Sequence, residues 1–418
     1  MQRFLLSLLL LASGTGLFAQ NVEDIEKAFS AGQLDKAKEN VDAFLAKEKN
    51  ATKPDGWWYK GVVYNEIAKS DKYNNLVKDG RMEAFNAFKK YYELDAKAVR
   101  ATLEQHVRLF DIYNGYFDQG VKGFNDSRFD DAYSNFKNAL TVEEYINGKG
   151  FDYNGFKFPA FDTTLIQNIA LSAYRAKKED DAMIYYKKIA DQKIAGKDNV
   201  DVYQLMYEYY LKRNDKANAT KYLELGRELF PADDRWYQLE LAEGDGDDKK
   251  KHFAKYEELL PKYPDKYILS YNYAVELYNY LYTGDNKPAD YKESQEKLVK
   301  ALNMTMAANK DYPDANVLMA RHYYNVIYDI QDEQKAIKTN TPADQKKKAE
   351  IKDRMIQTAD KMITYAKAAY DVYDSKATLK AIEKGNFKVV SDLLSSAYEV
   401  KGDKEKTEMY KKKLESIN

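Results

Sequence analysis

Two consecutive segments, YQLMYEYYLKRNDKANATKYLELGRELFP (Tyr203–Pro231) and WYQLELAEGDGDDKKKHFAKYEELLPKYP (Trp236–Pro264), share one spacing of residue types. Each opens on an aromatic residue and closes on a proline. The matched pairs, each 33 residues apart, are Tyr203 and Trp236, Met206 and Leu239, Ala219 and His252, Leu223 and Tyr256, and Pro231 and Pro264. A fixed interval of this length is the signature of a repeat architecture.

Other parts of the chain match the same spacing in part. One partial unit contains Trp57, Gly61 and Tyr64, and continues with Ala84 and Phe88 after an insertion; the others contain Gly120, Phe129, Ala132, Phe136 and Ala139, and Ala170, Ala173, Ala182, Tyr186 and Ile189. A recurring turn joins the two halves of a unit, as in Gly32–Ala37, Ser127–Ala132, Lys178–Ala182 and Gly402–Thr407. We expect Gly, Asn or Asp to end one helix and cap the next, and a small residue one turn later to let the helices approach closely.

The period is close to the roughly 34 residues of the tetratricopeptide repeat, and the residue types follow its order of aromatic, Leu, aromatic, Ala, aromatic and Pro. The chain therefore resembles tetratricopeptide-repeat (TPR) proteins of an exported bacterial type. The resemblance implies an all-α fold, a TPR-like α-solenoid of antiparallel helix pairs with irregular insertions. It departs from the pattern at Glu240 and His252, which stand where small residues are typical.

Beyond Asp265 the expected helices are longer than TPR helices: Ile268–Tyr282, Tyr291–Asn309, Asn316–Lys338 and Asp344–Tyr373. We predict TPR-like repeats over 20–264 and a part with longer helices and a C-terminal cap over 265–418, continuous with the first. Lysines on the outer side of the last unit (Lys404, Lys406, Lys411 and Lys412) suit a terminal cap.

The first residues read as a secretory signal peptide covering 1–19. A short positive start precedes the apolar run from Phe4 to Leu11, and small residues lead to Ala19, after which we expect cleavage. The run is too short to span a bilayer well, and no later segment is long and apolar enough to do so. No Cys is present to carry a lipid. The sequence predicts a periplasmic or secreted protein that is not a lipoprotein and has no transmembrane segment in the mature chain.

Composition limits the classes of function. The 418 residues contain 66 Lys and Arg against 67 Asp and Glu, so the charge balance gives no reason to expect a nucleic-acid partner. The lack of Cys removes disulfides, thiol catalysis and Cys–zinc sites. His106, His252 and His322 are far apart in sequence, and Asp245–Asp248 lacks the spacing of a calcium loop. With no phosphate loop or catalytic motif, the sequence predicts no metal, no cofactor and no enzyme.

Aromatic residues are the candidate contacts. In TPR proteins the first helix of each unit lines the concave face, which the resemblance implies here for two sets of residues at equivalent angular positions. The first set is Trp58, Phe117, Gln167, Gln204, Tyr237 and Tyr271; the second, two turns on, is Asn65, Phe124, Tyr174, Leu211, Gly244 and Tyr278. Neither set contains the Lys and Arg that grip a C-terminal carboxylate. The rings either face a groove that binds a peptide or ligand, or pack against the adjoining helix.

An insertion between two units, Glu144–Asp162, adds five further rings. Phe151, Tyr153, Phe156, Phe158 and Phe161 alternate with Gly, Asn and Pro, a pattern that forbids a long helix and permits a short hairpin or tight loop. Loops inserted in repeat arrays often carry binding. The alternative is that the rings fold back over an apolar helix edge, since five exposed rings would be a sticky surface.

The leading hypothesis is an exported non-enzymatic TPR scaffold or adaptor that mediates protein–protein interaction in the bacterial cell envelope. Its partner would be a protein or peptide, contacted by Trp58, Phe117, Tyr174, Tyr237, Tyr271 and Tyr278 and by the loop residues Phe151, Tyr153, Phe156 and Phe158. The alternative hypothesis is a glycan- or small-ligand-binding protein on the same helical scaffold, since aromatic platforms bind sugars.

Overall fold

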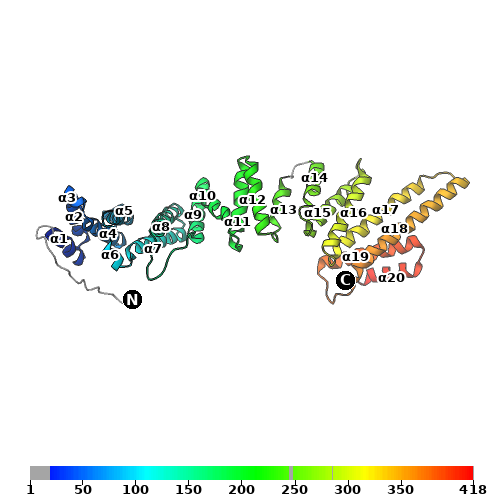
Figure 1. The fold of residues 1–418 in the computed structure, drawn as a ribbon. Helices are drawn as coiled ribbons and strands as arrows, with labels where there is room; N and C mark the ends of the chain where they lie inside the picture. The colour runs from blue at the N-terminus through cyan, green and yellow to red at the C-terminus, as the bar shows by residue number, and fades with distance from the viewer. Residues whose placement is uncertain (1–18, 244–247, 285, 418) are drawn as a thin grey trace. The chain divides into compact units, whose positions relative to one another are not determined.

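The computed structural model of the chain describes residues 19–243, 248–284 and 286–417. Nearly all of the expected signal peptide and most of the acidic stretch Asp245–Asp248 lie outside these ranges. The described residues form twenty α-helices and two short 3₁₀ helices, with no β-strand beyond one isolated bridge between Tyr153 and Phe156 (Figure 1). None of the described helices is long and apolar enough to cross a membrane.

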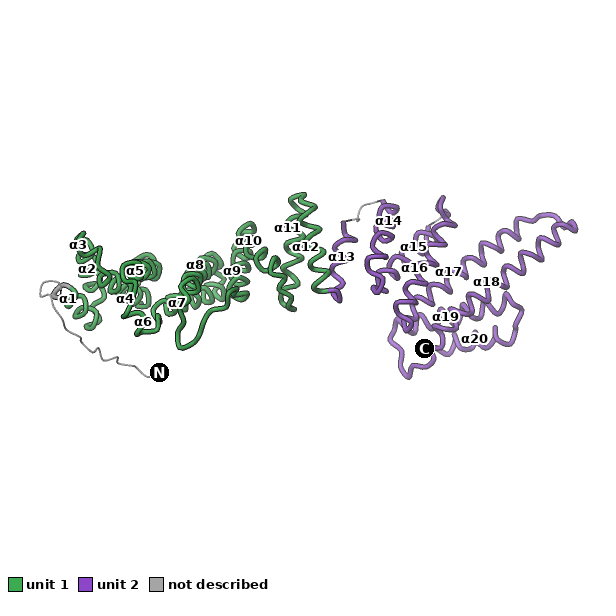
Figure 2. The backbone as a smooth tube through the Cα atoms, viewed as in Figure 1, with its two compact units in different colours: residues 1–230 green, residues 231–418 purple. Residues whose placement is uncertain are grey.

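Two compact units make up the chain, residues 1–230 and residues 231–418 (Figure 2). The boundary that the sequence suggested near Asp265, and the continuity of the array across it, stay predictions. Unit 1 contains α1 (Ala19–Ser30), α2 (Leu34–Leu45), α3 (Glu48–Ala51), α4 (Pro54–Lys69), α5 (Gly80–Leu94), α6 (Val99–Leu103), α7 (Val107–Asn125), α8 (Phe129–Lys149), α9 (Thr163–Arg175), α10 (Glu179–Asp191), α11 (Val200–Lys212) and α12 (Lys216–Leu229), with 3₁₀ turns at Asn74–Leu76 and Lys197–Asn199.

Unit 2 contains α13 (Arg235–Ala242), α14 (Lys249–Leu259), α15 (Tyr267–Tyr282), α16 (Tyr291–Ala308), α17 (Pro313–Lys335), α18 (Pro342–Asp374), α19 (Ala381–Lys401) and α20 (Lys404–Ser416). The two longest described helices, α17 and α18, are among them. In both units successive helices pack as antiparallel pairs: α1 with α2, α4 with α5, α7 with α8, and so on to α19 with α20. The all-α fold of helix pairs is therefore confirmed, as are the longer helices after Asp265.

The turn inside a pair is built by the backbone. In five pairs the residue before the N-cap of the second helix has a positive φ: Gly32, Ser127, Lys177, Asn214 and Gly402. The next amide then donates to a carbonyl five residues back, as Arg128 N does to Gly123 O at 2.7 Å and Asp403 N to Tyr398 O at 2.9 Å. This is the Schellman arrangement. The expected side-chain capping occurs at Asp215 and Asp403, and Gln33, Arg128 and Lys178 form no side-chain cap, so the common element is the left-handed residue.

Glycine sets the distance between two of the paired helices. A Cβ at Gly61 would lie 2.6 Å from the ring of Phe88, and a Cβ at Gly120 would lie 2.6 Å from the ring of Phe136. Both glycines are in the first helix of a pair and both rings are in the second. The repeat spacing thus places a ring of one helix directly on the bare backbone of its partner.

Tyrosine hydroxyl groups tie neighbouring helices together at the edge of the core. Each donates a hydrogen bond of 2.6–3.0 Å to a carboxylate of another element: Tyr64 to Asp42, Tyr116 to Asp79, Tyr273 to Glu257, Tyr291 to Asp329, and Tyr373 to Asp314. Burial raises the pKa of all five phenols, so they stay protonated and donate. A ring that fills the core therefore also forms a charge-assisted bond at its rim.

Replacing Gly120 by Ala should destabilise the protein, because the new methyl group collides with the Phe136 ring. Overpacking of this kind costs about 1–3 kcal/mol, against a gain of about 1 kcal/mol in helix propensity. Gly148→Ala is the matched control, since nothing lies within 4 Å of a Cβ there. Urea unfolding should show a lower midpoint for Gly120→Ala and an unchanged or higher one for Gly148→Ala. Equal midpoints would contradict the close approach.

Candidate functional site

The two rows of candidate contacts are divided between the units. Trp58, Phe117 and Tyr174 belong to unit 1, and Tyr237, Tyr271 and Tyr278 belong to unit 2. Gly244, from the second row, lies outside the described residues. A single groove running along all six rings stays a prediction, and each ring is described within its own unit.

Trp58 and Tyr237 are not surface contacts. Trp58 is 5% exposed, and its ring centroid lies 5.4 Å from that of Phe88 and 5.0 Å from that of Tyr91. Tyr237 is 3% exposed and packs edge-on against Tyr263. The physical reason is that the first helix of a pair is covered on more than one side: α4 packs on α5 and also on α2 and α7. A large ring at this angle gains more from burial than it would from facing solvent.

The other four rings vary in exposure. Phe117 is half-buried against Tyr113 and Phe136, and Tyr271 is half-buried against Tyr312. Tyr278 is also half-buried, and its hydroxyl accepts a 3.1 Å hydrogen bond from Asn325 Nδ2. Tyr174 alone of the six is largely open to solvent, at 41% exposure. Most of the row is therefore engaged in packing.

The aromatic loop Gly150–Asp162 contains a tight hairpin with a two-residue turn. Tyr153 and Phe156 exchange both backbone hydrogen bonds, at 3.1 and 2.9 Å. Between them Asn154 and Gly155 have φ values of 51° and 78°. Positive φ at both central positions is the type I′ turn that Asn-Gly favours. The hairpin that the sequence permitted is thus present.

The base of the loop is fixed on the α6–α7 corner of unit 1. The Phe151 ring stacks on His106 with centroids 3.8 Å apart, and Phe158 stacks on Phe110 at 5.4 Å. The amide of Asn154 donates to Gln105 Oε1 at 3.0 Å. Burial beneath the loop lowers the pKa of His106. Gln105 and His106 both have positive φ, and their side chains hold the loop.

The tip of the loop remains exposed. The rings of Tyr153 and Phe156 are 36% and 54% exposed, although both contact Phe110. Phe151 and Phe158 fold back over the helices, as one reading of the sequence held, while Tyr153 and Phe156 face solvent and their role in binding stays a prediction. Phe158 is thus corrected from a partner contact to a core residue, since Phe110 and Tyr113 enclose its ring. We use "loop tip" below for Tyr153–Phe156.

A buried carboxyl lies behind the loop. Glu143 of α8 is 2% exposed, and its Oε2 has no hydrogen-bond partner among the described residues. Burial and, to a smaller extent, the nearby carboxylates of Asp162 and Glu144 raise the pKa of Glu143 to about 7. Asp162 closes the loop by accepting from Leu165 N at 2.9 Å, which caps α9. Glu143 and Asp162 thus couple α8 electrostatically to the end of the loop.

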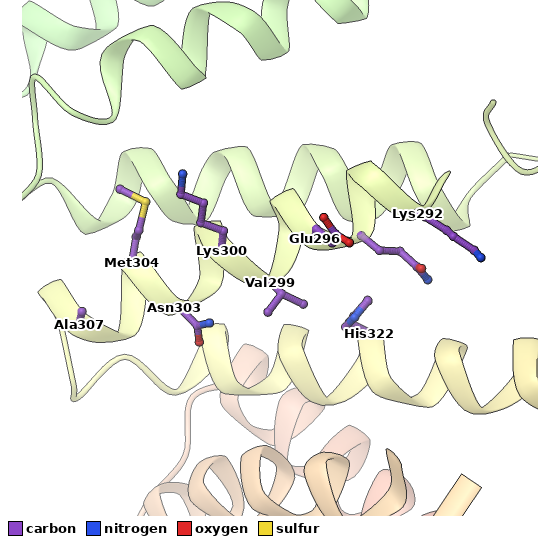
Figure 3. A pocket seen from close by; sticks show the side chains of 9 residues that line it. Lys292, Glu296, Val299, Lys300, Asn303, Met304, Ala307 and His322 are labelled. Carbon is purple, nitrogen blue, oxygen red and sulfur yellow. The ribbon is translucent and has the colours of Figure 1, made fainter. Parts of the chain in front are cut away.

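Unit 2 contains a separate cavity of about 780 Å³ along the outer face of α16. Residues from Lys292 to Ala307 line it, and His322 of α17 projects toward them (Figure 3). Lys292 and Lys300 carry the positive charges of the lining, and Glu296 carries a negative charge. Val299, Met304 and Ala307 supply apolar surface. No Phe, Tyr or Trp is among the lining residues, so the wall lacks the rings on which sugars usually stack.

A hydrogen-bond chain connects His322 to the neighbouring helices. Gln295 Nε2 donates to Asp329 Oδ2 at 3.5 Å and to the Tyr282 hydroxyl at 3.0 Å. That hydroxyl is hydrogen-bonded to His322 Nδ1 at 2.9 Å. Burial lowers the pKa of His322 to about 4, so the ring is neutral at pH 7.

Sequence reasoning missed this chain and Glu143. The histidine was set aside because no second histidine or cysteine accompanies it, and its partners Tyr282, Gln295 and Asp329 come from three different helices. Glu143 did not stand out in the sequence, because the chain contains many other carboxylates. Its only sequence signal is its position on the apolar face of α8, between Val142 and Ile146, which are both buried.

Solved structures of TPR proteins are similar to this chain. A TPR protein from Bacteroides fragilis is 13% identical and has a TM-score of 0.32, with 67% of this chain and 98% of that chain covered. The C-terminal part of a TPR repeat-containing protein from Cytophaga hutchinsonii is also 13% identical with a TM-score of 0.32, covering 72% and 95%. No protein-family model matches the sequence, and no curated protein matches it. The likeness is one of fold: the described residues form helix pairs similar to those of TPR proteins.

Phe158→Ala should lower the free energy of unfolding by about 3 kcal/mol, the usual cost of removing a packed Phe ring. Phe156→Ala should change it by less than about 1 kcal/mol, because that ring is largely solvent-exposed. Urea unfolding of the two variants, compared with the unaltered chain, gives the measurement. Similar costs at the two positions would contradict the division of the loop into a packed base and an exposed tip.

Glu143→Gln should reduce the pH dependence of stability. With a folded-state pKa of about 7, above the usual value of 4.5, the folded protein retains a proton that the unfolded chain has released between these pH values. The free energy of unfolding therefore falls as pH rises through this window. Relative to the unaltered chain, the variant should gain about 1–3 kcal/mol between pH 5 and pH 8.

Urea unfolding of Glu143→Gln at a series of pH values would measure this effect. Glu224→Gln, an exposed position on α12, is the control and should leave the pH profile unchanged. Parallel profiles for Glu143→Gln and the unaltered chain would show that the carboxyl ionises normally.

Proposed function

We propose that the chain is an exported, non-enzymatic scaffold that binds a protein or peptide partner through the loop tip, Tyr153–Phe156, in the bacterial cell envelope. The observation that carries the proposal is an exposed pair of aromatic rings on a fixed base. Phe156 is the more exposed ring, at 54%, while Phe151 and Phe158 in the same loop are packed. The export part of the proposal rests on the signal-peptide pattern of residues 1–19.

Because the base of the loop is fixed, binding explains the exposure of the Tyr153 and Phe156 rings better than chance does. Binding anchors are often aromatic, because such rings bury a large area with few rotatable bonds. A loop that is already ordered loses little conformational entropy when a partner docks. Here the type I′ turn, the Asn154–Gln105 hydrogen bond and the stacking of Phe151 on His106 order the loop in the free chain.

A second candidate function is the binding of a small polar ligand in the α16 cavity. Its volume, about 780 Å³, is within the usual range for small-molecule sites. The neutral ring of His322 and the amide of Asn303 would supply hydrogen-bond donors and acceptors. A glycan is the less suited ligand, since the lining offers it no Phe, Tyr or Trp ring to stack on.

Photo-crosslinking from the loop tip tests the leading proposal. A photoreactive phenylalanine analogue in place of Phe156 should give a discrete crosslinked protein in intact producing cells, and that species should fractionate with the envelope. The same analogue at Ile184 of α10, which has a similar exposure of 56%, is the control and should give none. With the isolated partner, Phe156→Ala should weaken binding by about 1–3 kcal/mol, or five- to 150-fold.

Identical crosslinks from positions 156 and 184, or undiminished partner affinity of Phe156→Ala, would remove the loop tip as the binding site. Recovery of the crosslinked species in the cytoplasmic fraction would contradict export.

A further inference from the structure

A second, smaller cavity lies in unit 2 where three helices converge. It has a volume of about 400 Å³ and is lined by α17, α18 and α19. Five of its lining residues determine its chemistry: Tyr324 and Tyr328 from α17, Met355 and Met362 from α18, and Glu399 from α19. These residues are separated by up to 75 positions in the chain, and only the packing of the three helices brings them together.

The inner wall of this cavity is apolar and adaptable. Met362 and Ile327 are fully or almost fully buried, and Met355 packs against the same cluster. Methionine side chains are unbranched and polarizable, so they adjust to the shape of a flexible hydrocarbon stem. The wall therefore suits an aliphatic chain better than a rigid polar group.

Two tyrosines form the aromatic side of the cavity. The rings of Tyr324 and Tyr328 lie edge to face with centroids 4.9 Å apart, and their hydroxyl groups are 2.9 Å apart and hydrogen-bonded. The hydrogen bond holds both rings at the cavity. The face of a tyrosine ring carries partial negative charge and attracts a cation placed over it.

The lining of the cavity carries one charged side chain, the carboxylate of Glu399. Glu399 is the only carboxylate of the lining, which contains no Lys, Arg or His, and Glu399 forms no ion pair within the described residues. Two neighbouring cations are already paired: Lys401 with Asp360, and Arg354 with Glu333 at 2.7 Å. Glu399 is also in the last turn of α19, whose C-terminal end carries partial negative charge. The cavity therefore has unbalanced negative charge beside an apolar wall.

We propose that this cavity binds an organic cation on an aliphatic stem, the chemistry of a lysine or arginine side chain of a partner polypeptide or of a free diamine. The stem packs on Met355, Met362 and Ile327. The charged head lies at Glu399 and against the faces of Tyr324 and Tyr328. An anion would be repelled by Glu399, and a neutral hydrocarbon would leave the negative charge of Glu399 unbalanced. The proposal does not depend on the loop tip, which belongs to unit 1.

Methyl NMR of methionine-labelled protein tests the proposal with defined probes. The probes are N-acetyl-lysine methylamide, N-acetyl-arginine methylamide and 1,5-diaminopentane, and the neutral control is the lysine probe acetylated on its side-chain nitrogen. The Met355 and Met362 methyl signals, assigned by Met→Leu variants, should shift and saturate with the cations and not with the acetylated probe. Added salt should weaken the binding, because the attraction is partly electrostatic.

Matched variants locate the cation. Glu399→Gln should weaken binding at least fivefold, and Tyr328→Ala should also weaken it, whereas Glu405→Gln on the exposed face of α20 should have no effect. Tighter binding of the capped residues than of the diamine assigns the site to a polypeptide partner, and the reverse order assigns it to a free diamine. Both orders support the cation chemistry.

Absence of shifts with every cation, equal shifts with the acetylated probe, or unchanged affinity in Glu399→Gln would overturn the proposal. Because Phe156→Ala leaves this cavity intact, failure of the loop-tip crosslink and failure of the cation titration are separate results.

Discussion

The structure depends on the burial of one apolar stripe per helix by its neighbours. A helix pair need not cover its own stripe, as α4 shows by packing on α2 and α7 in addition to its partner α5. The two helices of a pair must also stay in contact across the segment that joins them, and in five pairs this segment has only two or three residues. Each of these five turns contains one residue in the left-handed conformation, although Ser127, Lys177 and Asn214 are not glycines. The left-handed conformation of a non-glycine residue costs free energy, and the packing of the apolar stripes of the two helices offsets that cost.

Tyrosine both fills the core and connects neighbouring helices in this chain, which has 37 tyrosines and nearly balanced charge. A phenylalanine would fill the same volume, but the hydroxyl of a buried tyrosine reaches a carboxylate at the rim of the core. Tyr64–Asp42 and Tyr273–Glu257 are examples in unit 1 and unit 2. These bonds connect one helix to another, so they favour one register of packing over its neighbours.

The sequence contained enough to predict the fold, because the repeat interval and the turn residues are local. It predicted helix pairs, the long helices after Asp265 and the site of the inserted loop. It could not separate Trp58 and Tyr237 from surface residues, because the repeat spacing gives only the register of a ring and not the packing of Trp58 on Phe88 and Tyr91 or of Tyr237 on Tyr263. For the loop, the Asn-Gly turn was readable from sequence. The positions of Phe151 on His106 and Phe158 on Phe110 were not, since each contact joins residues more than 40 positions apart.

The same reasoning indicates where binding can occur in such a chain. Positions that follow the period are used for packing, so a side chain placed there by the repeat is already engaged. The loop tip and the α17–α19 cavity are found where the period fails, whereas Tyr174 is an exposed ring at a repeat position. The loop tip belongs to an insertion, and the α17–α19 cavity lies where helices of 23 and 33 residues replace the shorter helices of the regular units. Lengthening α17 and α18 moves Tyr328 and Met355 beyond the span that a regular pair would cover, and α19 then closes the space with Glu399. Departures from the repeat are thus the positions at which this scaffold can present specific chemistry without weakening its own core.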